Sequence, residues 1–185
     1  GKAYRGSFNN THAQTLAGHA ISEAVKRAKV DPTDIDDVIL GAAAQQGTQQ
    51  GNIARQSLLR AGLPTSVAGM SIDRQCASGM MAISTAAKQI IADGMNITVG
   101  GGVESVSLVR NENFRMDNAR DPWLENEMPE LYMTMIETAE TVADRYGISR
   151  ERQDEYALQS QMRTEQHMPK EMGLWMMKLC LLSRQ

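Results

Sequence analysis

The sequence predicts an α/β fold in which short buried strands alternate with helices in layers. Apolar runs of strand length end in glycines or polar turns, and segments with the apolar spacing of helices follow them. Strands and helices that alternate at this spacing are typical of α/β layered folds. The chain has 185 residues, 42% of them hydrophobic and 22% charged, which is enough to bury the core that such a fold needs.

The individual elements follow from hydrophobic periodicity. In chain order, we expect a helix over residues 11–29, a strand within 36–44, a polar loop over 45–51, a helix over 52–61, a strand over 67–72, a helix from 76 to about 87, and a strand over 96–99. In the first helix, Ile21 and Val25 share one apolar face. Pro32 ends that helix, because the residue before a proline avoids the helical region.

The helix from residue 76 has small or apolar residues on nearly every side, so we expect it to be buried on all sides. The glycines at 100–102 are not a dinucleotide fingerprint, because their spacing is wrong and no helix follows them. Residues 41–51 also lack the Gly-Lys-Ser/Thr of a phosphate loop. We interpret both stretches as tight backbone turns at strand ends.

The second half of the chain begins with an irregular polar stretch over residues 103–129. A connection of that length is usually functional or inserted. Two helices are then expected, over 132–146 and 149–167, with Gly147 between them. The charges around Arg150 predict a solvated helix face.

Composition excludes several classes of function. Net charge is −3, which gives no reason to expect a nucleic-acid partner. No run approaches the ~20 apolar residues of a membrane-spanning helix, and the start lacks the layout of a secretory signal. The two cysteines, Cys76 and Cys180, are too few for a disulfide framework, so we expect a reducing cytoplasm. His12, His19 and His167 form no cluster with cysteines, so we expect no metal site and expect His12 and His19 at the surface.

Cys76 is the first candidate for chemistry, since it lies between a strand with a polar turn and an apolar helix. At a helix start, unpaired backbone N–H groups and the helix dipole favour thiolate over thiol, which makes the sulfur nucleophilic. A cysteine beside small residues is also commonly an inert part of the core. The residues alone leave both interpretations open.

The segment Asp73-Arg74-Gln75-Cys76-Ala77-Ser78-Gly79 resembles the nucleophile signature of the thiolase family, in which a strand end runs into a Cys-x-Ser-Gly turn. Other segments resemble the family in the same order, over about residues 1–164: Gly1-Lys2, Asp36-Asp37-Val38-Ile39-Leu40-Gly41, residues 45–55, Gly100-Gly101-Gly102-Val103-Glu104-Ser105, Glu137-Thr138-Ala139-Glu140, and residues 146–154. The resemblance implies a thiolase-like layered fold. This chain would be its amino-terminal half, with an inserted substrate-loop region and without the first strand.

The resemblance implies an acyl-CoA C-acyltransferase, in which Cys76 takes an acyl group from one coenzyme A thioester and a second acceptor removes it. Such a reaction cleaves a 3-ketoacyl thioester in fatty-acid β-oxidation, or condenses two acyl units into acetoacetyl-CoA. Met135 would line the substrate pocket, whereas Thr134 stands where many short-chain members carry histidine, which leaves the acyl-chain length open. The implied partners are acyl-CoA and acetyl-CoA as substrates, with no cofactor, and the parent enzyme would be a homodimer or homotetramer.

The resemblance also implies that the activating histidine, a second cysteine and oxyanion-hole donors lie beyond residue 185. A thiolate without these groups loses several orders of magnitude in rate, so we expect the isolated chain to be inactive. The alternative function is therefore a truncated thiolase that acts at most as an association partner, because absent elements would expose sheet edges and apolar surface. A thiolase-like lipid carrier is disfavoured by the intact signature around Cys76.

We predict three regions: an α/β core over 1–105, an inserted loop and helical region over 106–164, and an aberrant tail over 165–185. One interpretation of the methionine-rich tail is an amphipathic helix with Leu174, Met177 and Leu181 on one stripe. Another is out-of-frame translation: codons for residues 175–180, shifted by one base, encode Asp-Asp-Glu-Ile-Val-Pro, which thiolases carry at this point. On that hypothesis Cys180 has no catalytic role, and the encoding DNA is the test.

Overall fold

The computed structural model describes residues 6–167 and 180–183. The chain divides into two units, one comprising Gly1–Arg115 with Trp175–Gln185 and the other Met116–Leu174. The out-of-frame hypothesis concerns residues of which 168–179 and 184–185 lie outside the described part of the chain. The three predicted regions stay a prediction.

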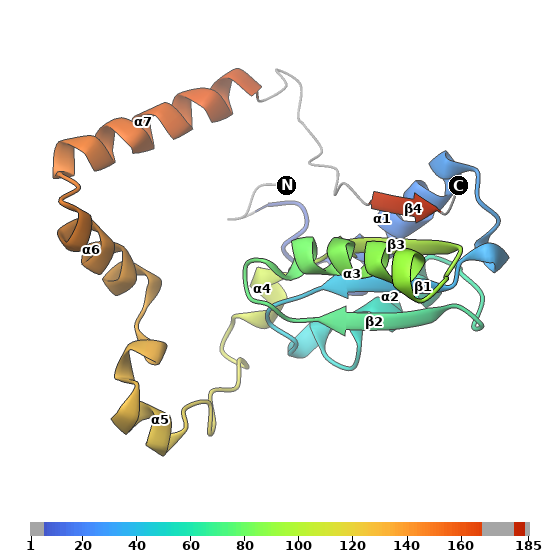
Figure 1. The fold of residues 1–185 in the computed structure, drawn as a ribbon, viewed down its shortest axis with the longest axis horizontal. Coiled ribbons are helices and arrows are strands. Elements are labelled where there is room, and N and C mark those ends of the chain that lie inside the picture. Colours follow the sequence, from blue (N-terminus) through green and yellow to red (C-terminus); the bar gives the residue numbers. More distant parts are fainter. Residues whose placement is uncertain (1–5, 168–179, 184–185) are drawn as a thin grey trace. The chain divides into compact units, whose positions relative to one another are not determined.

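A four-stranded sheet forms the centre of the first unit (Figure 1). Its strands are β1 (Asp37–Gly41), β2 (Ala68–Ile72), β3 (Ile97–Gly102) and β4 (Cys180–Ser183), in the order β2-β1-β3-β4. β1 pairs in parallel with β2 and β3, whereas β4 pairs antiparallel with β3. Because β1, β2 and β3 are parallel, their last residues Gly41, Ile72 and Gly102 lie side by side at one edge of the sheet.

Helices cover both faces of this sheet. The helices α1 (Ala13–Ala28) and α2 (Ile53–Arg60) pack on one face and α3 (Ser78–Ala92) on the other, as Figure 1 shows. Alternate residues of β1 serve the two faces: Val38 and Leu40 join the larger core with α1 and α2, while Ile39 packs against Ala82 and Ala86 of α3. Shorter elements complete the unit: η1 (Pro32–Asp34), η2 (Gly47–Gln49) and α4 (Val106–Val109). The α/β layered fold predicted from the sequence is confirmed.

The helix α3 differs from its prediction, because it is not buried on all sides. Met80 and Ile91 are 77% and 81% exposed, whereas Ala82, Ala86 and Gln89 face the sheet and are buried. The helix packs on the sheet along one side, and no described residue covers Met80 or Ile91. The apolar composition of this helix permits burial on every side. Which sides are buried depends on the elements that pack against the helix.

The glycine stretch at 100–102 also differs from its prediction, because it continues β3 instead of forming a turn. A Cβ at Gly100 would lie 2.9 Å from the Cα of Ile83, so glycine lets α3 approach the sheet closely. In the loop after β1, by contrast, Gly47 and Gly51 have φ of 53° and 67°, where glycine meets no penalty. The turn prediction is confirmed at those two positions.

The described part of the second unit contains four helical elements, and none of residues 116–165 is buried. They are α5 (Pro122–Glu127), η3 (Pro129–Tyr132), α6 (Met135–Tyr146) and α7 (Arg150–His167). Local signals set their bounds: Asp121 Oδ1 accepts from Leu124 N (2.9 Å) at the start of α5, and Gly147 ends α6 in the left-handed conformation. Both long helices predicted here are confirmed. In the tail, the helical interpretation is wrong at Leu181, which lies in β4.

Candidate functional site

Cys76 lies in the turn that connects β2 with α3, at the carboxyl edge of the parallel strands. The prediction that α3 begins at Cys76 is off by two residues, since the helix starts at Ser78. The thiol is free and its residue is exposed, so a substrate can reach the sulfur. In open α/β sheets, ligands bind outside the carboxyl ends of the strands, which is where this turn lies.

Hydrogen bonds within the turn fix its shape. Ser78 Oγ accepts from Arg74 N (2.8 Å) and donates to Gln75 O (2.6 Å), so one hydroxyl after Cys76 holds the two residues before it. Asp73 Oδ1 accepts from Gln75 N at 2.8 Å. Gln75 itself has φ of 47°, a left-handed conformation that costs a residue with a side chain about 1–2 kcal/mol. Strain of this kind persists only where the surrounding contacts hold it.

The backbone N–H groups that follow Cys76 are already used. Ala77 N donates to Arg74 O and Ser78 N donates to Gln75 O, each at 3.0 Å. The sequence argument assumed that such groups would be unpaired beside the cysteine, and at these two residues that assumption is wrong. The turn therefore offers an accessible sulfur at the positive end of a 15-residue helix, with its own first amides satisfied internally.

Three glycines form the contact between this turn and the strand ends. A Cβ on Gly41 would overlap the carbonyl carbon of Ser78 and the amide nitrogen of Gly79. A Cβ on Gly102 would lie 3.0 Å from Gly41 O and 3.3 Å from Gly79 Cα. The start of α3 therefore rests directly on the ends of β1 and β3, and no side chain fits between them.

A polar cluster next to these glycines escaped the sequence reasoning. We call it the exit cluster: Ala43, Ala44, Gln49, Glu104 and Ser105, which join the chain leaving β1 to the chain leaving β3. Glu104 Oε2 accepts from Ala43 N (2.8 Å), Glu104 Oε1 accepts from Gln49 Nε2 (2.6 Å), and Ser105 N donates to Gln49 Oε1. Gln49 is fully buried although it lies in the loop predicted to be polar. The signal available in the sequence was Glu104 itself, a carboxylate two residues after the end of β3.

Met135, the predicted substrate-pocket residue, lies in the second unit and Cys76 in the first. It is the first residue of α6 and is 74% exposed. Its neighbour Thr134 has a structural role: it accepts from Glu137 N (3.2 Å), and Glu137 Oε2 accepts in return from Thr134 N (2.8 Å). The substrate pocket at Met135 stays a prediction.

His12 and His19 are exposed, as predicted, and His12 Nδ1 lies 3.3 Å from Thr48 Oγ1. The side chain of His167 lies outside the described residues. Across the described ranges, no group of three or more His, Cys, Asp or Glu side chains could hold a metal ion. Within those same ranges, no helix has the length and apolar character needed to cross a membrane.

The fold and the turn define a class: an α/β protein with an accessible cysteine at the carboxyl edge of its parallel strands. Comparison with known proteins makes this specific, because the family model described as "Thiolase, N-terminal domain" matches residues 1–172. The chain therefore belongs to the thiolase family.

Curated relatives agree with this family. The chain is 38% identical over 162 residues to the 3-ketoacyl-CoA thiolase of Bacillus subtilis (strain 168), covering 86% of this chain and 40% of the relative. It is 39% identical over 175 residues to the beta-ketoadipyl-CoA thiolase of Pseudomonas aeruginosa, covering 86% and 44%. It is 37% identical over 172 residues to the acetyl-CoA acetyltransferase of Cupriavidus necator, covering 88% and 44%. The chain thus spans less than half the length of these relatives.

Proposed function

We propose that this chain carries the nucleophile of a thiolase-type acyl-CoA C-acyltransferase, and that the nucleophile is Cys76. The single observation that supports this most is the position of the turn: an exposed thiol, held in a hydrogen-bonded bend at the carboxyl edge of a sheet, in a chain of the thiolase family. An inert core cysteine would be buried. The exposure of Cys76 favours a chemical role.

The proposed half-reaction is a transfer between two sulfurs. The Cys76 thiolate attacks the carbonyl carbon of an acyl-CoA thioester, the bond from that carbon to the coenzyme A sulfur breaks, and the coenzyme A thiolate takes up a proton. The acyl group then resides on Cys76 Sγ as a thioester, from which a second acceptor removes it. Three relatives are named for different acyl substrates, so the acyl chain and the direction of the reaction stay open.

We propose coenzyme A thioesters as the substrates, without a bound cofactor, since the transfer from sulfur to sulfur exchanges no electrons. A reducing compartment such as the cytoplasm suits this chemistry, because an exposed nucleophilic thiol must stay reduced. Assembly into dimers or tetramers is a proposal on the same family basis.

Acylation of Cys76 tests this function, and it requires only the first half-reaction. Because the isolated chain is expected to show no turnover, the test detects a single slow acylation: the chain is incubated for hours with excess acetyl-CoA, digested, and analysed by peptide mass spectrometry. We expect a hydroxylamine-sensitive acetyl group on the peptide that contains Cys76. The chain has two cysteines, which provides a matched pair of variants: Cys76→Ala should abolish the label and Cys180→Ala should keep it. A label that survives Cys76→Ala would remove Cys76 from the mechanism.

A further inference from the structure

The three residues that follow β1 each donate a backbone N–H group to an acceptor at or just after the end of a neighbouring strand. Ala42 N donates to Ile72 O (3.0 Å), the last residue of β2 before the Cys76 turn. Ala43 N donates to Glu104 Oε2 (2.8 Å) and Ala44 N to Glu104 Oε1 (3.4 Å), just after β3. The chain leaving β1 is therefore held between the start of the Cys76 turn and the carboxylate of Glu104.

Gln49 completes this arrangement from inside the protein. Its Nε2 donates to Glu104 Oε1 (2.6 Å) and to Ala44 O (2.7 Å), and its Oε1 accepts from Ser105 N. A fully buried amide with all of these partners satisfied is rigid, since any rotation would leave a polar group unpaired. Gln49 therefore fixes where the Glu104 carboxylate lies, and the carboxylate fixes Ala43 and Ala44.

The end of β1 also contacts the start of α3, which follows the turn that contains Cys76. Gly41 touches the backbone of Ser78 and Gly79 so closely that no Cβ fits. A shift of the β1 exit must therefore move the start of α3, and with it the bend that Ser78 Oγ holds around Gln75 and Cys76. Glu104 is exposed, so it does not contribute to the hydrophobic core. Its contribution here comes from the hydrogen bonds that its carboxylate accepts.

We infer that Glu104 and Gln49 are positioning residues, which set the location of the Cys76 thiol through the exit of β1. This inference rests on the proposed function, because it assigns the pair to the acyl transfer at Cys76. It requires no contact between the carboxylate and the sulfur. The carboxylate acts through Ala43 and Ala44, then through Ala42 and Gly41, on the turn.

Two variants of Glu104 separate positioning from simple packing. Glu104→Ala removes the acceptor of both amides, whereas Glu104→Gln keeps the shape and one oxygen and should recover part of the effect. Glu112→Ala, at an exposed glutamate elsewhere in the same unit, is the matched control. At saturating acetyl-CoA, the rate of Cys76 acylation should fall about fivefold in Glu104→Ala, the factor that loss of one net hydrogen bond produces. The half-saturating concentration and the rate of alkylation by iodoacetamide, a small reagent, should stay within about twofold, since neither depends on exact placement of the sulfur.

Amide hydrogen exchange on the same proteins provides a second readout that needs no acylation. In Glu104→Ala, exchange should accelerate about tenfold at Ala43 and Ala44 and also at Ala77 and Ser78, with Val99 unchanged. Acceleration confined to Ala43 and Ala44, or an unchanged acylation rate, would overturn the inference. If the unmodified chain takes no acetyl group, the proposed function fails, and the exchange at Ala77 and Ser78 still decides whether Glu104 positions the turn. If Glu104→Ala does not fold, the same two readouts are taken from Glu104→Gln.

Discussion

At the scale of single residues, the candidate site depends on glycines, which have no Cβ atom. Gly41 and Gly102 lack the Cβ that would separate the strand ends from the start of α3. Gly79 belongs to the same contact, yet its own Cβ direction is open, with nothing within 4 Å. The three glycines therefore differ sharply in how much a methyl group would cost.

Gly41→Ala should destabilise the fold by about 1–3 kcal/mol, the usual cost of overpacking, because the new methyl group overlaps the backbone of Ser78 and Gly79. Gly79→Ala should instead raise stability by about 0.5–1 kcal/mol, because alanine is the better residue inside a helix. Urea unfolding of both variants measures the difference. Equal stability of the two would show that the strand exit can move away from α3.

Asp37 and Gln89 are buried together, and their side chains leave hydrogen-bond acceptors unpaired among the described residues. Gln89 Nε2 donates to Asp37 Oδ2 at 2.8 Å, while Asp37 Oδ1 and Gln89 Oε1 have no hydrogen-bond partner in the part of the chain that the structure describes. In Asp37→Asn, the new amide can donate to Gln89 Oε1 and still accept from Gln89 Nε2. We expect a gain of about 1 kcal/mol in the free energy of unfolding, one net hydrogen bond. Asp37→Leu is the contrasting variant, and it should lose stability because Gln89 Nε2 is then unpaired. A loss in both variants would contradict this account.

Single residues also show what the sequence could predict. Cys76 could be found because a strand, a polar turn and an apolar helix surround it in sequence, and because its neighbours match a family signature. The contact between Gln49 and Glu104 could not be predicted, since 55 positions separate them in the chain and only the pairing of β1 with β3 brings them together. The exposure of Cys76 was equally hidden, because helical periodicity does not fix where a helix begins to within two residues.

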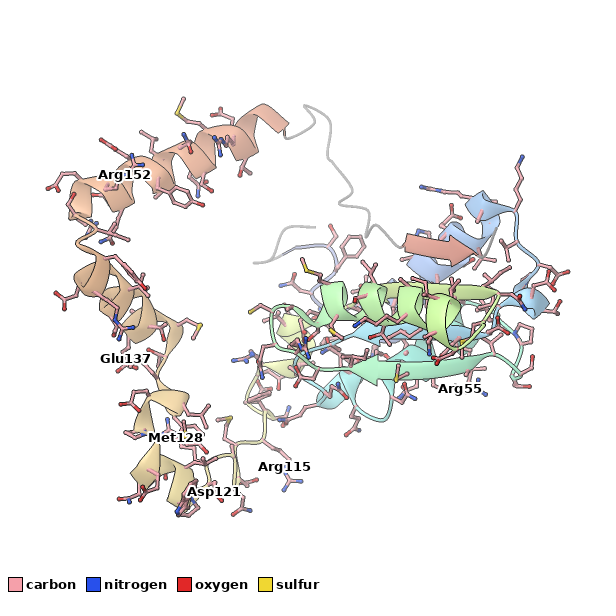
Figure 2. The ribbon with its side chains drawn as sticks, in the orientation of Figure 1. Arg55, Arg115, Asp121, Met128, Glu137 and Arg152 are labelled. Carbon is pink, nitrogen blue, oxygen red and sulfur yellow. The ribbon has the colours of Figure 1, made fainter. Side chains whose placement is uncertain are left out.

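At the scale of elements, local signals predicted the helices of the second unit well. The Thr134–Glu137 capping box starts α6 and Gly147 ends it, and both signals lie within a few residues of what they control. Figure 2 labels Glu137 near the start of this helix. The connection before β2 shows the opposite case. Arg55 of α2, also labelled in Figure 2, donates to Thr65 O (2.9 Å) and to Val67 O, and periodicity contains no sign of these contacts.

The capping box predicts a pH dependence for α6. Hydrogen bonds from the Thr134 backbone and then its hydroxyl hold the pKa of Glu137 below its ordinary value of 4.5. A depressed carboxyl pKa stabilises the folded form above the unfolded pKa, and that stabilisation is lost as pH falls through the folded pKa. Backbone carbon chemical shifts of residues 135–138 should therefore move toward coil values below about pH 4.5, the ordinary value. Thr134→Ala should already show weakened shifts at neutral pH, and Glu140→Gln should behave like the unmodified chain. Shifts that stay constant to pH 2 would contradict the prediction.

At the scale of the whole molecule, burial is uneven between the two units. Val38, Ile39, Leu40 and Val99 are fully buried in the first, whereas residues 116–165 of the second include none that is buried. The sequence predicted the helices of the second unit, because their periodicity is local. It did not predict that they would lack a core, because apolar residues such as Met135 do not show in sequence what covers them.

Hydrogen exchange across the intact chain should separate the two units. Amides of β1 and β3 should exchange at least about 100-fold more slowly than those of α6 and α7, because local opening costs little where few apolar contacts must break. Mass spectrometry of peptides from both units gives the rates side by side. Comparable protection in α6 and α7 would mean that these helices are covered in solution, as the association-partner alternative requires. Dilution of the sample would then be expected to reduce that protection.

The left-handed conformation of Gln75 has a consequence for the unfolded chain as well as for the folded one. Glycine at this position would remove the strain of a φ of 47°, yet it would also let the unfolded chain sample more conformations. The two effects oppose each other in the free energy of unfolding: relief of the strain adds about 1–2 kcal/mol, and the freer unfolded chain removes about 0.4–1 kcal/mol. In the turn itself, a side chain narrows the range of backbone angles next to Cys76. Gln75 therefore narrows the backbone conformations available beside the nucleophile, at a small net cost in the free energy of unfolding.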